Sequence, residues 1–331
     1  KLMQQCQLPT AVNYISICRQ TALNLRGEAV DPCLLVGEIF NELETLPVFI
    51  EAKNFTFICL VYHFKTQLNF LFNKYASALE NSRLFEKHEE VAAGFYVVSM
   101  NNFYSSLSVL ALYAQVNKQE QKQYLKKLAK NQTKLKKWAF HAPMNYQHKY
   151  DLVEAEKARV LGNTVAAMNL YDRAIKGSQE NEYINEEALA NELAAKFYLD
   201  WGKEKVAQAY MQAAYYCYAR WGAKAKIDDL ETRYPQLLTA ILQAQQDHFS
   251  ISDTRLETLD RSSILDRTIH TTRSSSSISE SLDFATILKA SQALSSQIQL
   301  EQLVSTLMQV VMENAGAKKA GLLLLQEDIL M

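Results

Sequence analysis

The stretch DLVEAEKARVLGNTVAAMNLYDRAIKG, residues 151–177, decides the fold, because its pattern recurs 40 residues later in NELAAKFYLDWGKEKVAQAYMQAAYYC, residues 191–217. Apolar residues three and four apart on each side of a central glycine predict a helix, a tight turn and a second helix in each copy. Ala167 and Ala174 lie seven residues apart on one predicted helix face, where small side chains let a second helix approach closely. The matched positions are Val153 with Leu193, Leu161 with Trp201, Gly162 with Gly202, Ala167 with Ala207, Leu170 with Tyr210 and Ala174 with Ala214.

Weaker copies of this pattern precede the pair. The polar pairs Asn73-Lys74 and Asn117-Lys118 lie 44 residues apart, and Asn117 precedes Gly162 by 45, so both pairs are candidate turns of earlier hairpins. Only nine Gly and five Pro occur, which favours long helices with short connections. The predicted helices are 11–26 and 33–52 in an irregular first pair, 55–72 with 75–88, 91–116 with 119–138, and a last helix 223–233 before Pro235.

Each hairpin resembles a tetratricopeptide-type unit in the spacing of its small and large residues. The copies have one extra residue at the turn, and Glu154 and Ala194 stand where that family has a glycine, so the repeat is divergent. Stacked units of this kind bury a core between neighbours and leave a concave surface free for a partner. The sequence therefore predicts a mainly α fold, an α-solenoid of tetratricopeptide-like hairpins over residues 1–245.

Composition excludes several classes of protein. Of 331 residues 48% are hydrophobic, enough for a sizeable core, and 35 basic residues nearly balance 36 acidic ones, so no overall charge recruits nucleic acid or an anionic membrane. The five cysteines are an odd number without a CxxC pair, which favours reduced thiols and a cytoplasmic setting. No signal-peptide pattern is seen at residue 1.

Residues 91–117 carry no charge and are long enough to span a bilayer, but Asn101, Asn102 and three serines near the centre favour a buried core helix.

The strongest charge feature is KQEQKQYLKKLAKNQTKLKKW, residues 118–138, with eight lysines and one glutamate. Three leucines give this predicted helix one apolar stripe and leave a basic face. A solvated outer face, contact with an acidic protein or a neighbouring domain, and contact with nucleic acid or lipid all stay open, although the segment lacks arginine. The candidate partner-binding residues are Lys122, Lys126, Lys130 and Lys134.

No catalytic, cofactor-binding or metal-binding residue is predicted. The chain lacks the GxxxxGK[ST] phosphate loop, the HRD and DFG motifs of protein kinases and the nucleotide-binding glycine boxes of histidine kinases. His141 and His148 alone cannot complete a tetrahedral metal site, so we interpret them as loop residues. The adjacent pairs Glu186-Glu187 and Asp228-Asp229 point to different sides of a helix and cannot share a proton, so we expect them on solvated faces.

The character of the sequence changes after residue 245. Residues 246–281 contain few large apolar residues and a serine cluster, which predicts a linker, and Arg273-Ser274-Ser275-Ser276-Ser277 is a candidate site of regulatory phosphorylation. Periodic apolar residues over 287–298 and 300–310 predict one long amphipathic helix or two. GLLLLQEDILM, residues 321–331, then predicts a buried strand with no later partner, so we expect the chain to be a piece of a longer protein.

Two segments together resemble the middle of very large hybrid sensor kinases: residues 190–238, which include WGAKAKIDDLETRYPQLL, and residues 282–325, which include LDFATILKASQALSSQIQLEQLVSTLMQ. Such chains place a Ser/Thr-kinase-like domain and an AAA-type ATPase domain before this helical segment, and a GAF sensor domain and a histidine kinase after it. The resemblance implies that residues 300–314 and 320–325 are the first helix and strand of a GAF domain. Residues 282–331 would then be a connecting helix and a truncated GAF start.

The resemblance also implies a function. The chain would be a non-catalytic interaction and signal-transmission segment of a sensor kinase, coupling an upstream ATPase and kinase region to a downstream GAF sensor and histidine kinase. ATP would serve the parent protein, and this chain would hold no cofactor. Its partners would be other domains of the parent or a protein on the concave face, not nucleic acid or a membrane. Helix 287–298, with about two heptads, is a candidate for pairing with its copy in a homodimer. The alternative is a stand-alone tetratricopeptide-like adaptor or transcription-regulating scaffold.

Overall fold

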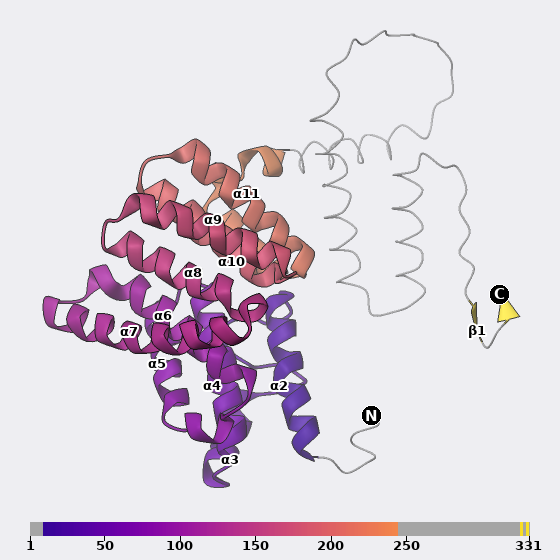
Figure 1. Cartoon of the computed structure of the whole chain (residues 1–331). Coiled ribbons are helices and arrows are strands. Elements are labelled where there is room, and N and C mark those ends of the chain that lie inside the picture. Colours follow the sequence, from indigo (N-terminus) through magenta and orange to yellow (C-terminus); the bar gives the residue numbers. More distant parts are fainter. Residues whose placement is uncertain (1–8, 244–324, 327–328, 331) are drawn as a thin grey trace, which may run out of the picture. The chain divides into compact units, whose positions relative to one another are not determined.

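The computed structural model of the protein describes residues 9–243, 325–326 and 329–330. The chain divides into two units, residues 1–233 and 234–331. The described part of the first unit is almost entirely helical (Figure 1). Its helices are α2 (Pro9–Leu25), α3 (Glu42–Glu51), α4 (Phe55–Leu71), α5 (Tyr75–Glu86), η1 (Glu89–Ala92), α6 (Tyr96–Leu112), η2 (Tyr113–Gln115), α7 (Lys118–His141), α8 (Pro143–Val160), α9 (Thr164–Glu180), α10 (Ile184–Asp200), α11 (Glu204–Trp221) and α12 (Lys224–Arg233).

Helices α8 to α11 form the two hairpins that the repeated stretches predict. Gly162 and Gly202 stand in the two turns with φ of +77° and +74°, a backbone conformation that glycine adopts without steric cost. The four alanines matched between the copies are at most 1% exposed: Ala167, Ala174, Ala207 and Ala214. Their small side chains let the paired helices pack closely. The prediction of a mainly α fold built from stacked helices is therefore confirmed.

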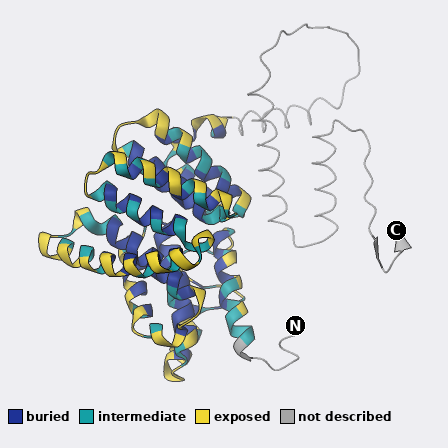
Figure 2. Ribbon diagram, in the orientation of Figure 1, coloured by how far each residue is buried: buried dark blue, intermediate teal, exposed yellow. Residues whose placement is uncertain are grey.

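The hairpins place their helices in two layers. α4, α6 and α10 are buried over most of their length, whereas α7 and α9 bury one stripe and expose the rest (Figure 2). In α6, Ser106 and Ser108 donate hydrogen bonds of 2.7 Å to the carbonyls of Asn102 and Tyr104, so buried hydroxyls are satisfied inside the helix. The buried core helix expected here is confirmed. No described helix has both the length and the apolar character needed to cross a bilayer.

The first and last helices of the first unit lie against each other. α12 packs on α2, and a side chain added at Gly27, just after α2, would lie 3.7 Å from the backbone nitrogen of Ala225. Lys226 of α12 donates a hydrogen bond of 2.7 Å to the carbonyl of Leu71 at the end of α4. The inner helices α4, α6 and α10 are thus largely covered by the unit's own helices.

Two helices begin later than the sequence predicts. α3 begins at Glu42 rather than near residue 33, because the Asn41 side chain caps it by accepting a hydrogen bond of 3.0 Å from the Leu43 nitrogen. α6 begins at Tyr96 rather than at residue 91, because Gly94 adopts a φ of +87° between η1 and α6. In both cases a local backbone signal outweighs the apolar periodicity.

In the second unit the structure describes η3 (Pro235–Leu237), a helical stretch over residues 239–243 and two short strands, β1 (Leu325–Gln326) and β2 (Ile329–Leu330). The strands pair antiparallel, with Leu325 opposite Leu330. The expectation that nothing after the leucine-rich strand could pair with it is therefore wrong, because the last residues supply a partner strand. The predicted linker 246–281, the connecting helix 287–298, the GAF helix 300–314 and most of the strand 320–325 lie outside the described residues.

Candidate interaction site

Helix α7 carries the lysine-rich segment and begins at a complete cap. The Asn117 side chain accepts hydrogen bonds from the Gln119 and Glu120 nitrogens, and the Glu120 carboxylate accepts one from the Asn117 nitrogen. Leu128 and Leu135 are buried on the stripe that packs against α6 and α8. The opposite side of α7 is therefore turned outward, and Figure 2 shows it exposed.

The four predicted lysines do not have equivalent surroundings. Lys122, Lys126 and Lys130 are exposed, whereas Lys134 is half-buried and its ammonium lies 3.0 Å from the Glu89 carboxylate. Lys126 and Lys130 make no ion pair with any residue that the structure describes. Because the Lys134–Glu89 ion pair is only partly buried, it contributes about 1 kcal/mol or less, so the contact orients Lys134 more than it stabilises the fold.

A hollow of about 510 Å³ opens beside α7, bordered by α5, η1 and α6, and we call it the lysine hollow. Lys126, Lys130 and Lys134 line it together, whereas Lys122 does not. The structure therefore brings three of the four predicted residues to one place. The sequence did not single out Lys127, which also lines the hollow and pairs with Glu86 at 2.8 Å.

Two asparagines of α6 line the same hollow and have unsatisfied oxygens. Asn101 and Asn102 are 3% and 7% exposed, yet the side-chain oxygen of neither accepts a hydrogen bond. Asn131 of α7, by contrast, donates to the Ser106 hydroxyl at 3.1 Å. Because a buried amide oxygen without a donor is costly, these two oxygens mark places where a ligand could donate. From the sequence, both residues count only as evidence against a membrane span.

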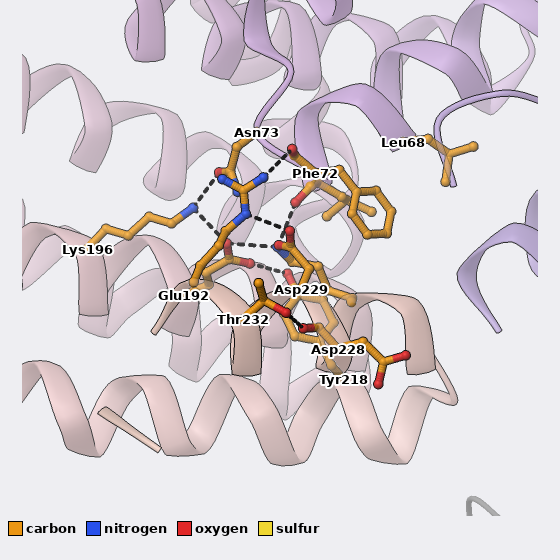
Figure 3. Close-up of polar contacts among 12 residues, drawn as sticks. Leu68, Phe72, Asn73, Glu192, Lys196, Tyr218, Asp228, Asp229 and Thr232 are labelled. Carbon is orange, nitrogen blue, oxygen red and sulfur yellow. Dashed lines mark hydrogen bonds and ion pairs between the residues drawn. The ribbon is translucent and has the colours of Figure 1, made fainter. Parts of the chain in front are cut away.

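A second group of charged side chains lies where α4, α10 and α12 meet (Figure 3), and we call Glu192, Lys196, Lys226, Asp229 and Arg233 the Lys226 cluster. Glu192 and Lys226 are buried, whereas Arg233 at its edge is exposed. The Lys226 ammonium is 0% exposed and lies 3.1 Å from Glu192 and 2.9 Å from Asp229. Glu192 also pairs with Lys196 at 2.7 Å. Opposite charges therefore compensate one another, as burial requires. Asp229 was expected on a solvated face, and the structure places it against this buried ammonium.

The Lys226 cluster also reaches the turn after α4. Lys196 donates to the Asn73 side-chain oxygen at 2.8 Å, and Arg233 donates to the carbonyl of Phe72 at 3.4 Å (Figure 3). Burial alone would raise the pKa of Glu192, but Lys196 and Lys226 outweigh burial and lower it to about 2. Glu192 is therefore ionised at neutral pH, and the cluster keeps its charges.

Glu186 is likewise buried rather than solvated. Its carboxylate contacts the Nε2 atom of His148 and lies 2.6 Å from the Lys149 ammonium, and all three residues are buried. Burial lowers the pKa of Lys149, although Glu186 opposes the shift. His141 is the last residue of α7 and His148 lies within α8, so neither is a loop residue, which corrects the interpretation from sequence. Among the described residues no three side chains of metal-ligand type come together.

The cysteines in the described part of the chain are free thiols. Burial raises the pKa of Cys33 and Cys59 to about 11 and that of Cys217 to about 12. Since the thiolate is the reactive form, these side chains behave as core residues at neutral pH.

Comparison with known proteins indicates a relationship to signal-transduction kinases. The chain is similar to hybrid signal transduction histidine kinase G of Dictyostelium discoideum, with 43% identity over 61 residues. The match covers 18% of this chain and 2% of that kinase, so the chain accounts for a small part of the relative's length. No protein-family model matches the chain, and no solved structure does.

Proposed function

We propose that this chain is a non-catalytic interaction and signal-transmission segment of a large sensor kinase, built from tetratricopeptide-like hairpins. The observation that carries the proposal is the Lys226 cluster, which joins the turn after α4 to α10 and α12 through buried charges. Elements tied in this way move together, so a displacement of the N-terminal hairpins is passed to the last helix. The similarity to a hybrid histidine kinase supports the signalling context.

The proposed mechanism is mechanical. α12 ends at Arg233, and the sequence continues towards the segment that resembles a connecting helix, 287–298, and the start of a GAF domain. An upstream ATPase and kinase region, or a bound protein, displaces the hairpins. The connecting helix is paired with its copy in a homodimer, and its displacement biases the downstream GAF sensor and histidine kinase. Catalysis and ATP belong to those other domains, and the setting is cytoplasmic.

A flexible Gly-Ser insertion at Ser281 of the parent protein tests this transmission. We expect histidine-kinase autophosphorylation to lose its response to inactivation of the upstream ATPase region, because a flexible linker cannot pass on a displacement. The control is the same insertion beside Gly162, at an exposed turn where an added side chain meets nothing within 4 Å. A response that survives the Ser281 insertion unchanged contradicts the proposed function.

A second candidate function is that of a stand-alone tetratricopeptide-like adaptor or transcription-regulating scaffold. The lysine hollow favours it, since unpaired cations in a hollow can engage a partner without any kinase attached. The coding sequence on both sides distinguishes the two candidates. Kinase, ATPase and GAF sequences in the same reading frame support transmission, whereas a native start codon near Lys1 and a stop codon after Met331 support the adaptor.

A further inference from the structure

We propose that the lysine hollow binds an extended acidic peptide segment of a partner protein. The inference deepens the proposed function by naming the chemistry of the partner, and it rests on that function in treating the hollow as the place where a partner engages the chain. Two independent features of the same hollow point to such a ligand: cations without a counter-ion and buried oxygens without a donor.

The cations match the repeat of an extended chain. Lys127 and Lys134 are held by glutamates at 2.8 and 3.0 Å, whereas Lys126 and Lys130 make no ion pair within the described ranges. Being four residues apart on one helix, these two project from the same side, about 6 Å apart along the axis. Side chains two apart in an extended peptide also share one side and are about 6.6 Å apart. Acidic residues at alternate positions can therefore meet both ammonium groups.

The buried oxygens select a peptide over other polyanions. The side-chain oxygens of Asn101 and Asn102 need donors, and the backbone of a peptide supplies N–H groups. The phosphates of a nucleic acid or a phospholipid membrane offer only acceptors, so contact through phosphates alone would leave both oxygens unpaired. A ligand that carries both N–H groups and carboxylates fits the whole hollow.

Fluorescence anisotropy of the purified chain with a fluorescein-labelled peptide of alternating Glu and Ala tests the proposal. We expect Lys126→Glu/Lys130→Glu to weaken binding about tenfold or more, and the neutral Lys126→Gln/Lys130→Gln to weaken it less but measurably. The matched control is Lys136→Glu/Lys137→Glu, which makes the same charge change at two exposed lysines of α7 outside the hollow. It should change the affinity by no more than about twofold, since screening weakens charges that do not touch the peptide. Equal losses in the two Glu variants, or no binding to the wild-type chain at low salt, overturn the proposal.

The donor argument has its own test. An ester-linked version of the same peptide keeps the carboxylates and lacks the backbone N–H groups, so we expect it to bind several-fold more weakly. Single-stranded DNA and anionic phospholipid vesicles should also bind more weakly than the amide peptide. Equal affinity of the ester, or tighter binding of DNA or vesicles, overturns the proposal.

The two proposals can fail separately. Peptide binding to the isolated chain does not depend on the Ser281 insertion. Absent peptide binding with an intact coupling response in the parent kinase overturns the acidic-peptide inference alone. Normal peptide binding in a parent whose kinase ignores the Ser281 insertion overturns the transmission function alone.

Discussion

Inside this helical stack, a titratable side chain is neutral or charged according to what its neighbours offer. Lys226 faces two carboxylates, whereas His63 of α4 faces aromatic rings, with the Phe64 ring centroid at 5.0 Å and that of Tyr96 at 5.9 Å. The Nδ1 atom of His63 has no hydrogen-bond partner. Burial lowers the pKa of His63 to about 3, so the folded protein holds this imidazole uncharged at neutral pH.

The lowered pKa of His63 predicts a pH-dependent loss of stability. The unfolded chain protonates this residue below about pH 6.5, whereas the folded protein resists protonation down to about pH 3. The contribution of uncharged His63 to the free energy of unfolding is therefore complete above about pH 6.5. It is lost as the pH falls towards 3, and the free energy of unfolding then decreases by up to about 1.4 kcal/mol per pH unit. Urea unfolding measured at several pH values gives the dependence of the free energy of unfolding on pH. In His63→Gln this dependence should lack the part that His63 supplies. The control His141→Gln, at the exposed end of α7, should keep the wild-type pH dependence. The same pH dependence in the wild-type protein and both variants would exclude His63 as the cause of the lost stability.

At the scale of single elements, short local signals decide where each helix begins. Asn41 and Asn117 stand just before α3 and α7, and both side chains accept hydrogen bonds from the first turn. Such a cap satisfies backbone donors that have no partner within the helix. For α7 this matters to the candidate site, because the cap fixes the start of the helix that carries the lysines.

Removal of the α7 cap should cost stability without removing the binding surface. In Asn117→Ala the Gln119 and Glu120 nitrogens lose their side-chain acceptor, so we expect the free energy of unfolding to fall by about 1 kcal/mol. Hydrogen exchange should be faster in the first turn of α7. Lys118→Ala, at an exposed position without a cap role, should change stability by less than about 0.5 kcal/mol. Acidic-peptide binding should survive in Asn117→Ala, and a loss as large as that of the Lys126/Lys130 double variant would show that the first turn itself forms the site.

The hairpins are predictable from sequence because their signals are local. Spacings of three and four, together with Gly162 and Gly202 in the turns, indicate α8 to α11 without any knowledge of the fold. The burial of Glu186 and Asp229 is not local, because it depends on which distant helices meet. Each looks like one half of an exposed pair in the sequence, and each lies against a buried lysine in the structure.

The candidate site was predictable only in part for the same reason. The lysine stripe of α7 is visible in the sequence as charge on one helix face. Which of those lysines border a hollow depends on how α7 packs against α6 and on the glutamates that come from α5 and η1. The unsatisfied oxygens of Asn101 and Asn102 leave no trace in the sequence, since burial and hydrogen bonding are properties of the folded chain.

At the scale of the first unit, the ends of the helical stack are joined rather than left free. A linear array of repeats contacts only neighbouring repeats, so its ends unfold independently. Here Lys226 of α12 bonds to the carbonyl of Leu71, 155 residues earlier in the chain, and α12 packs on α2. The unit should therefore unfold more cooperatively than an open array, and the Lys226 cluster is the place to test this.

Lys226→Met removes the ammonium between Glu192 and Asp229. Loss of one partner from a buried ion pair costs about 3–5 kcal/mol, and we expect the lower end of that range because Lys196 and Arg233 still pair with the two carboxylates. Lys226→Met/Glu192→Gln should cost more than Lys226→Met alone, since Lys196 then loses its carboxylate partner. The control Lys224→Met breaks an exposed pair on the same helix and should cost less than about 1 kcal/mol.

Hydrogen exchange of Lys226→Met shows whether the cluster couples the two ends. If it does, amides at the end of α4 and in α12 should exchange faster together, because both lose the contact that joins them. Faster exchange in α12 alone would mean that the cluster stabilises only its own helix. In that case a displacement of the N-terminal hairpins would not reach α12, and the structural basis for transmission through the unit would be lost.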